Sequence, residues 1–108
     1  MNIVVTLNLF QGLIPFMQKS YIYILTNKYR TTFYIGVTAN LSKRLEEHYD
    51  ETASKFTKKY ITKDLIYFEE FSDIEQAISR EKQLKNWHKE WNLNLIRNLN
   101  PTLKTLDY

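Results

Sequence analysis

Short runs of aromatic and β-branched residues predict three β-strands in this chain. The runs at residues 21–25 (YIYIL) and 33–37 (FYIGV) are separated by a short polar link, which favours an antiparallel hairpin. Alternation along the first run places Tyr21 and Tyr23 on one face and the isoleucines on the other. A third run at residues 65–68 (LIYF) lies between charged pairs and predicts another strand.

Capping residues predict where two helices begin. The side chain of Asn40 can accept hydrogen bonds from backbone N–H groups of a helix over residues 41–51. The sequence SDIE at residues 72–75 is a capping box, so a second helix is expected over residues 73–85. Steps of three and four residues along this second helix align Glu81 with apolar residues, namely Ile74, Ala77, Ile78 and Leu84.

A third helix is expected over residues 87–98, just before Asn100-Pro101, because a proline disfavours helix at the residue that precedes it. Three apolar residues fall on one stripe of this helix: Trp91, Leu95 and Leu99. The complete order is β-β-α-β-α-α. It predicts the α/β (α+β) class, with a small three-stranded antiparallel sheet that is covered by helices.

Residues 1–18 differ from the rest of the chain, because they carry no charge and are interrupted by a glycine and a proline. The segment is too short and too broken to span a bilayer, and it lacks the features of a signal peptide. We consider a disordered tail, an extra edge strand, or residues upstream of a true start at Met17, and favour the first and the last. The expected domain then spans residues 19–100, with a C-terminal tail over residues 101–108.

Composition narrows the class of protein. The chain has 108 residues, enough for one domain with one core. Fifteen basic and 12 acidic residues give a formal net charge of +3, which is compatible with a polyanionic partner but does not require one. The absence of cysteine excludes a disulfide scaffold, a cysteine zinc site and a thiol nucleophile. We therefore expect a protein of a reducing compartment, the cytoplasm, without a membrane partner.

Polar side chains on otherwise apolar helix faces are the first candidates for chemistry. Glu81 lies in an apolar stripe, where a carboxylate is unfavourable unless it is paired, protonated or bound to a cation. Arg44 and His48 lie four residues apart at the edge of the apolar face of the preceding helix. A guanidinium suits a phosphate, and a neutral imidazole can accept a proton. The alternatives are a structural salt bridge at Glu81 and a solvated helix edge at the other two positions.

The strands add hydroxyl groups and a glycine to this set. Tyr23 and Tyr34 could either pack with a wet hydroxyl tip, as strand tyrosines commonly do, or take part in catalysis. Gly36, the only glycine after Met17, indicates a bulge or the close approach of a ligand to the backbone. One glycine excludes a Gly-rich phosphate loop, and the single inward-facing carboxylate, Glu81, is too few for a two-metal site. One carboxylate can hold a hydrated Mg²⁺ among phosphate oxygens, so we expect single-metal phosphodiester hydrolysis.

These positions together form a known pattern. It consists of Tyr21-Ile22-Tyr23, Tyr34-Ile35-Gly36, Arg44, His48 and Glu81. The pattern resembles the GIY-YIG nuclease superfamily, in particular its small single-domain, UPF0213-like members, and the likeness extends over nearly all of the chain after residue 19. The resemblance implies a divalent-metal-dependent DNA endonuclease that uses one Mg²⁺ or Mn²⁺ ion.

The resemblance also implies a role for each matching residue. Glu81 would bind the metal ion, and Arg44 would hold the scissile phosphate. Tyr23 and Tyr34 would orient or activate the attacking water, while His48 would assist proton transfer. Either phenol could be the base, since a phenol with a pKa of about 10 needs a nearby cation or histidine to serve near neutral pH.

Three positions depart from the family pattern. The first glycine of the family name is Tyr21 here, and the lysine that some repair nucleases carry after the second tripeptide is Val37. The phosphate-binding asparagine of the family is expected at Leu93, which leaves its neighbours Asn92 and Asn94 as candidates.

The expected partner is DNA that is bound with low sequence specificity, such as branched, nicked or single-stranded DNA in repair or recombination, because no attached DNA-binding domain is recognised. The residues expected to contact DNA are Gly36, Lys55, Lys58, Lys59, Lys85, Asn92 and Asn94. For the lysines, a solvated surface is the alternative. For the whole protein, the alternatives are a catalytically weak nucleic-acid-binding module with the same fold and a protein-interaction domain in which Glu81 is structural.

Overall fold

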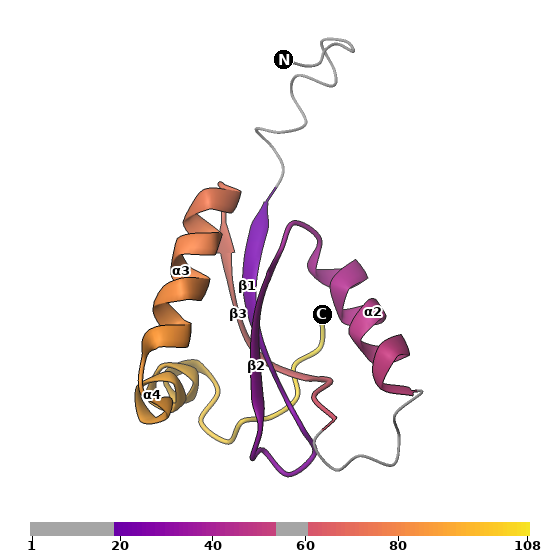
Figure 1. The fold of residues 1–108 in the computed structure, drawn as a ribbon. Coiled ribbons are helices and arrows are strands. Elements are labelled where there is room, and N and C mark those ends of the chain that lie inside the picture. The colour runs from indigo at the N-terminus through magenta and orange to yellow at the C-terminus, as the bar shows by residue number, and fades with distance from the viewer. Residues whose placement is uncertain (1–18, 54–60) are drawn as a thin grey trace.

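A computed structural model of the protein describes residues 19–53 and 61–108 (Figure 1). Its strands and helices are β1 Ser20–Thr26, β2 Phe33–Thr38, α2 Leu41–Ala53, β3 Asp64–Phe71, α3 Ile74–Asn86 and α4 Lys89–Leu99. This order confirms the expected sequence of elements, and the observed bounds differ from the expected ones by a few residues at most. The interpretations of residues 1–18 concern a segment outside the described residues.

The strands form a three-stranded antiparallel sheet, as predicted. Their order in the sheet is β2-β1-β3, with β1 in the centre. The register between β1 and β2 places Tyr23 opposite Gly36 and Ile24 opposite Ile35. Residues that lie directly opposite each other in an antiparallel pair point to the same face. Tyr23 and Gly36 therefore share one face of the sheet, and the two isoleucines share the other.

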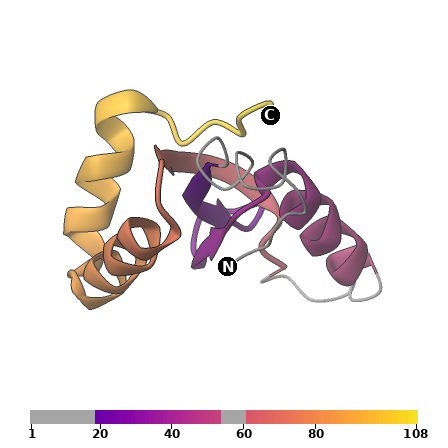
Figure 2. The same ribbon diagram turned by 90° about the horizontal axis from the view of Figure 1, so that it is seen from above.

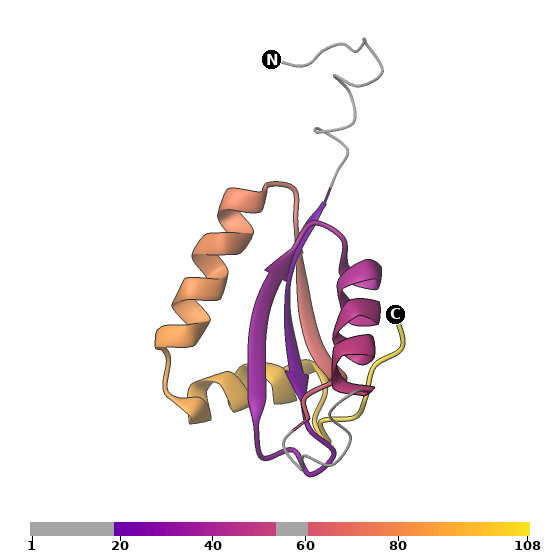
Figure 3. The same cartoon turned by 45° about the vertical axis from the view of Figure 1, so that its right-hand side comes forward.

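Helices cover both faces of this sheet. α3 and α4 lie against one face and α2 lies against the other, so the sheet is the middle of three layers (Figures 1 and 2). A third view shows the same arrangement (Figure 3). Because side chains alternate along a strand, β1 contributes to two separate cores.

The two cores hold most of the buried apolar residues. The core under α3 and α4 contains Ile22, Ile24, Ile66, Tyr67, Ala77, Leu84, Ile96 and Leu103. The core under α2 contains Tyr23, Leu25, Leu41 and Leu65. Burial of each large apolar side chain contributes roughly 1.5–3 kcal/mol, so these two sets account for how the layers hold together.

The predicted inner face of α3 is wrong in part. Ala77 and Leu84 are fully buried, but Ile74 and Ile78 of the same predicted stripe are 41% and 36% exposed. The two buried residues are seven positions apart, so α3 contacts the sheet along a narrow line of residues two helical turns apart. The apolar stripe in the sequence is broader than the part of α3 that the sheet covers, and periodicity alone did not predict this difference.

The predicted stripe of α4 is also wrong in part. Ile96 is the buried residue of this helix, with Leu93 partly buried against the same core. Trp91 and Leu99 are 54% and 77% exposed. Leu95, the third residue of the predicted stripe, is partly buried against the same core. α4 therefore packs with Leu93, Leu95 and Ile96 toward the sheet, and the two ends of the predicted stripe lie outside the contact.

Two side-chain caps fix the starts of α2 and α3. The Lys43 amide donates to Asn40 Oδ1 at 3.1 Å, which confirms the predicted cap of α2. The Glu75 amide donates to Asp73 Oδ1 at 2.9 Å, so Asp73 caps α3 and the helix begins at Ile74. The predicted capping box placed the cap one residue earlier, at Ser72.

The C-terminal segment after α4 packs onto the domain. Leu103 is buried in the core under α3 and α4, and Leu106 packs against the core under α2. The Leu106 amide also donates to the Leu65 carbonyl at 2.7 Å. Arg30 donates to the Leu103 carbonyl at 2.9 Å and to Asp64 at 2.6 Å. The segment that the sequence suggested as a tail is therefore held by both apolar and polar contacts.

Candidate active site

A buried tyrosine hydroxyl lies at the centre of the candidate site. Tyr23, in the middle of β1, is 1% exposed. Its hydroxyl lies 3.0 Å from His48 Nε2 and accepts a hydrogen bond from Arg44 Nε at 3.3 Å. Arg44 and His48 are one turn apart on α2, so one strand residue holds both helix side chains in place.

The close contact between β1 and β2 explains the glycine of this site. A Cβ atom on Gly36 would lie 2.4 Å from the Cζ atom and from the hydroxyl of Tyr23. Only a residue without a side chain leaves room for the phenol ring at this place. We expected a ligand near the Gly36 backbone, and in the structure the Tyr23 side chain fills the space beside its Cα atom. The expected DNA contact at Gly36 stays a prediction.

Tyr34 supplies the phenol that faces solvent. It lies two residues before Gly36 on the same face of β2, and 40% of it is exposed. The centroid of its ring is 5.0 Å from that of His48 and 6.1 Å from that of Tyr23. The structure thus brings together four of the predicted residues, with one phenol buried and the other open to solvent.

The electrostatics of the two phenols and the arginine follow from this packing. Burial raises the pKa of Tyr23 to about 12, although the hydrogen bond from Arg44 acts in the opposite direction. The hydrogen bonds of Arg44 with Tyr23 and, to a smaller extent, with Tyr34 raise the pKa of the guanidinium. At neutral pH the site therefore contains a neutral buried phenol and a permanent cation.

Arg44 also forms an ion pair that the sequence analysis missed. Its Nη1 atom lies 3.2 Å from Glu47 Oε1, three residues further along α2. Both side chains are partly exposed, so this pair is weak and can open when a stronger anion binds. The spacing of three residues in the sequence was the signal that could have predicted it.

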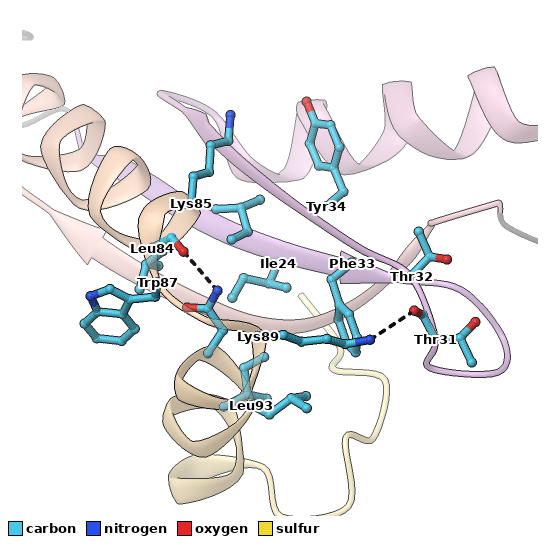
Figure 4. Close-up of a pocket in the computed structure, with 13 residues that line it drawn as sticks. Ile24, Thr31, Thr32, Phe33, Tyr34, Leu84, Lys85, Trp87, Lys89 and Leu93 are labelled. Carbon is cyan, nitrogen blue, oxygen red and sulfur yellow. Dashed lines mark hydrogen bonds between the residues drawn. The ribbon is translucent and has the colours of Figure 1, made fainter.

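Glu81 approaches the same edge strand from the other layer. It lies on α3, its side chain is 16% exposed, and its carboxylate is 3.2 Å from Lys85 Nζ. Within residues 19–53 and 61–108, no hydrogen bond or ion pair joins Glu81 to the four residues on the α2 side. Lys85 and Tyr34 line the same cavity beside β2, and Figure 4 shows their side chains extending in the same direction.

The donor set fits a single hydrated metal ion. The described part of the chain contains no group of three or more histidine and carboxylate side chains that could enclose a metal. Mg²⁺ commonly keeps several waters and is held by one or two carboxylates together with substrate phosphates. The partly buried Glu81 carboxylate can serve such an ion, provided that the exposed Lys85 ammonium moves away from it.

The remaining predicted DNA contacts are scattered. Lys55, Lys58 and Lys59 lie outside the described residues. Asn94 is exposed on α4, whereas Asn92 is half-buried and donates from Nδ2 to the Leu84 carbonyl at 2.9 Å. The Oδ1 atom of Asn92 is buried and has no hydrogen-bond partner among the described residues. Asn92 therefore links α4 to the end of α3, whatever else it contacts.

No helix in the described ranges combines the length and the apolar character that a membrane span requires.

Comparison with known proteins identifies the family. The GIY-YIG catalytic domain matches residues 19–94. A UPF0213 protein of Syntrophus aciditrophicus is 35% identical over 82 residues, which cover 75% of this chain and 93% of the relative. A UPF0213 protein of Pediococcus pentosaceus is 39% identical over 72 residues, covering 67% of this chain and 75% of the relative.

A solved structure agrees with the fold. The solution structure of a UPF0213 protein from Bacillus halodurans superimposes with a TM-score of 0.51 at 22% identity, covering 78% of this chain and 88% of the other. Since the matched domain spans the strands and helices that hold Tyr23, Tyr34, Arg44, His48 and Glu81, the chain belongs to the GIY-YIG catalytic domain family.

Proposed function

We propose that the protein is a divalent-metal-dependent endonuclease that hydrolyses phosphodiester bonds of DNA. The observation that carries this proposal is the buried Tyr23 hydroxyl, which fixes a guanidinium and an imidazole beside the exposed phenol of Tyr34. An anion-binding cation, a proton acceptor and a solvent-facing hydroxyl are the groups that hydrolysis of a phosphodiester requires.

The difference in burial between Tyr23 and Tyr34 suggests a different role for each phenol. Tyr34 is open to solvent and can contact the attacking water, whereas Tyr23 is enclosed and has a raised pKa. Tyr34 is therefore the better candidate for the base. It would act as a phenolate, whose negative charge the neighbouring Arg44 guanidinium stabilises, and would become the neutral phenol when it takes the proton of the water. Tyr23 is a positioning residue, because it holds Arg44 and His48.

Arg44 binds the phosphate that is cleaved. Its guanidinium donates to Tyr23 through Nε, so the two Nη groups can donate to a phosphate. The weak ion pair between Nη1 and Glu47 can be exchanged for a bond to a phosphate oxygen. His48 contacts the Tyr23 hydroxyl through Nε2 and can take up or return a proton there. The water oxygen then forms a bond to phosphorus as the bond to the leaving oxygen of the DNA chain breaks.

Glu81 is the residue that would hold the metal ion. A bound Mg²⁺ or Mn²⁺ supplies electrostatic stabilisation of the charge that develops on the phosphate. Glu81 and the α2 group lie on the two sides of β2, so a DNA strand that crosses this edge strand could contact both.

The preferred DNA follows from the basic side chains. Lys85 and Lys89 lie beside the site and can contact phosphates without reading sequence. We therefore propose low sequence specificity and a preference for branched, nicked or single-stranded DNA in repair or recombination. The lack of cysteine agrees with a place in the reducing cytoplasm.

Nicking of a supercoiled plasmid tests the proposal. Wild-type protein with Mg²⁺ or Mn²⁺ should nick the plasmid, and EDTA should stop the reaction. Glu81→Gln should lose on the order of 100-fold or more of the rate. Glu75→Gln removes an exposed carboxylate from the same helix and is the matched control, which should keep wild-type activity. Equal nicking by wild type and Glu81→Gln would exclude the proposal.

A second candidate function is a nucleic-acid-binding module with little turnover. It is favoured by the ion pair between Glu81 and Lys85, because a carboxylate that is satisfied by a lysine has no need of a metal. In that case branched DNA is retarded in a gel without being cleaved. If Glu81 is only structural, as in a protein-interaction domain, Glu81→Gln changes the melting temperature and metal ions leave it unchanged.

A further inference from the structure

A cavity lies next to the candidate site, on the other side of the edge strand. It has a volume of about 590 Å³ and is enclosed by β2, α3 and α4 (Figure 4). This size falls within the roughly 300–1,000 Å³ that is typical of sites for small ligands. Its floor is apolar. The partly exposed side chains that form it are Phe33, Ile35, Trp87 and Leu93, and they lie over the fully buried Ile24, Leu84 and Ile96.

Cationic side chains flank this apolar floor. Lys85 extends beside Tyr34, and Lys89 extends toward the start of β2 (Figure 4). The Lys89 ammonium donates to the Thr31 carbonyl at 3.4 Å and lies 5.2 Å from the centre of the Phe33 ring. An apolar floor between two ammonium groups suits a ligand that has a flat apolar part and an anionic group on either side.

The cavity and the candidate active site lie on the two sides of the same edge strand. Tyr34, on that strand, borders both, and Lys85 of the cavity is the ion-pair partner of Glu81. A ligand in the cavity would therefore lie beside the Lys85–Glu81 pair and across β2 from Arg44. This placement argues for a part of the DNA substrate rather than for a separate small molecule.

We propose that the cavity binds one unpaired nucleotide of the DNA substrate, with its base over the apolar floor and its two flanking phosphates at Lys85 and Lys89. The proposal rests on the proposed function and narrows its substrate to DNA that offers an extrahelical or single-stranded nucleotide next to the scissile phosphate. A base in an intact duplex is stacked and paired, and its removal requires a few kcal/mol, whereas an unpaired base enters at little cost.

Binding of duplexes with a single bulged nucleotide tests this inference. Fluorescence anisotropy is measured in EDTA, so that no cleavage occurs, with an adenine bulge, an abasic bulge of the same sequence and a fully paired duplex. Contact with one base is worth roughly 1–3 kcal/mol, which corresponds to at least about fivefold tighter binding of the adenine bulge than of the abasic bulge. Equal affinities for the two bulges would overturn the proposal.

Two variants locate the effect. Thr32→Trp places a large side chain at the rim of the cavity and should abolish the preference for adenine over the abasic bulge, because the indole fills the space of the base. The backbone groups of Thr32 that form hydrogen bonds with Thr26 and Asn27 are kept in this variant. Lys89→Gln should weaken binding of both bulges, and the exposed Lys104→Gln is its control of equal charge. Circular dichroism confirms that each variant is folded. A preference that persists in Thr32→Trp would place the base elsewhere.

The outcome separates this inference from the proposed function. If the wild type nicks plasmid DNA with Mg²⁺ but does not distinguish the two bulges, the endonuclease stands and the cavity does not hold a base. If the wild type neither cleaves nor binds any of these DNAs, both proposals fail.

Discussion

Replacement of Gly36 by alanine adds one methyl group to β2, at the point where β2 faces Tyr23. The new Cβ atom would lie 2.4 Å from the Tyr23 ring and hydroxyl, whereas unstrained carbon atoms are about 3.5 Å or more apart. The ring or the strand must therefore move by about 1 Å. Tyr23 is completely enclosed and cannot turn away into solvent.

The expected loss of stability can be built from its parts. Overpacking of a tight core costs about 1–3 kcal/mol. Displacement from Arg44 and His48 adds about 1–3 kcal/mol, because the buried Tyr23 hydroxyl loses its hydrogen bonds. Gly36 does not have a positive φ, so the alanine backbone itself is unstrained and would, without the clash, stabilise by about 0.4–1 kcal/mol. A loss of stability would therefore indicate that the Tyr23 ring requires a glycine here, whereas a gain would indicate that no such clash exists.

Urea denaturation of a double-mutant cycle measures this contact. We expect Gly36→Ala to lower the free energy of unfolding by about 2–5 kcal/mol in the wild-type background. In the Tyr23→Leu background, which lacks the ring, the same change should cost less than about 1 kcal/mol. Nicking activity should fall with Gly36→Ala even where the protein is folded, since Arg44 loses its support. A stabilising Gly36→Ala, or equal costs in both backgrounds, would refute the reasoning.

Three further predictions concern other contacts. The pKa of Tyr23, raised from 10 to about 12, means that its proton stabilises the fold below pH 10 and that this contribution is lost between pH 10 and 12. The stability of the wild type should therefore fall relative to Tyr23→Phe by roughly 3 kcal/mol over that range, as measured by urea denaturation at each pH. Burial favours a higher pKa for Glu69, but hydrogen bonds from Arg80 and Tyr67 lower it, so the carboxylate stabilises above its unfolded pKa and this is lost in acid. Arg80→Gln should cost about 1–3 kcal/mol at pH 7, and the difference from wild type should shrink below about pH 4. Tyr34→Phe should lose on the order of 100-fold in nicking while the protein stays folded, because Tyr34 is 40% exposed and not part of either core, and an unchanged rate would exclude Tyr34 as the base.

The features of this structure that depend on the spacing of residues within one strand or helix could be predicted from the sequence. The alternation of Tyr23 with its isoleucine neighbours fixed the two faces of β1, and the spacing of Arg44 and His48 placed them side by side. Both are properties of a single element, so no knowledge of its neighbours was needed. The same logic identified Asn40 as a cap, because a cap bonds to its own helix.

Contacts between elements were harder to foresee. Periodicity groups Ile78 with Ala77 and Leu84, but it does not say how much of that group a three-stranded sheet can cover, and Ile78 stays 36% exposed. For α4, the orientation depends on how Ile96 meets the core of β1, which is a property of the assembled layers. The close approach of Tyr23 to Gly36 likewise depends on the register between β1 and β2, which cannot be predicted from a single sequence.

The last residues of the chain cross the edge of the sheet at β3 and pack against both of its faces. Leu103 enters one layer and Leu106 the other, and Tyr108 stacks edge-on with Tyr21 and Phe68. A protein shortened after Asn100 would keep every residue of the family match. It would, however, expose the apolar surface that Leu103 covers on one face of the sheet and the apolar surface that Leu106 covers on the other. Such a shortened protein should aggregate during expression, and the boundary of the folding unit therefore lies beyond the boundary of the recognised domain.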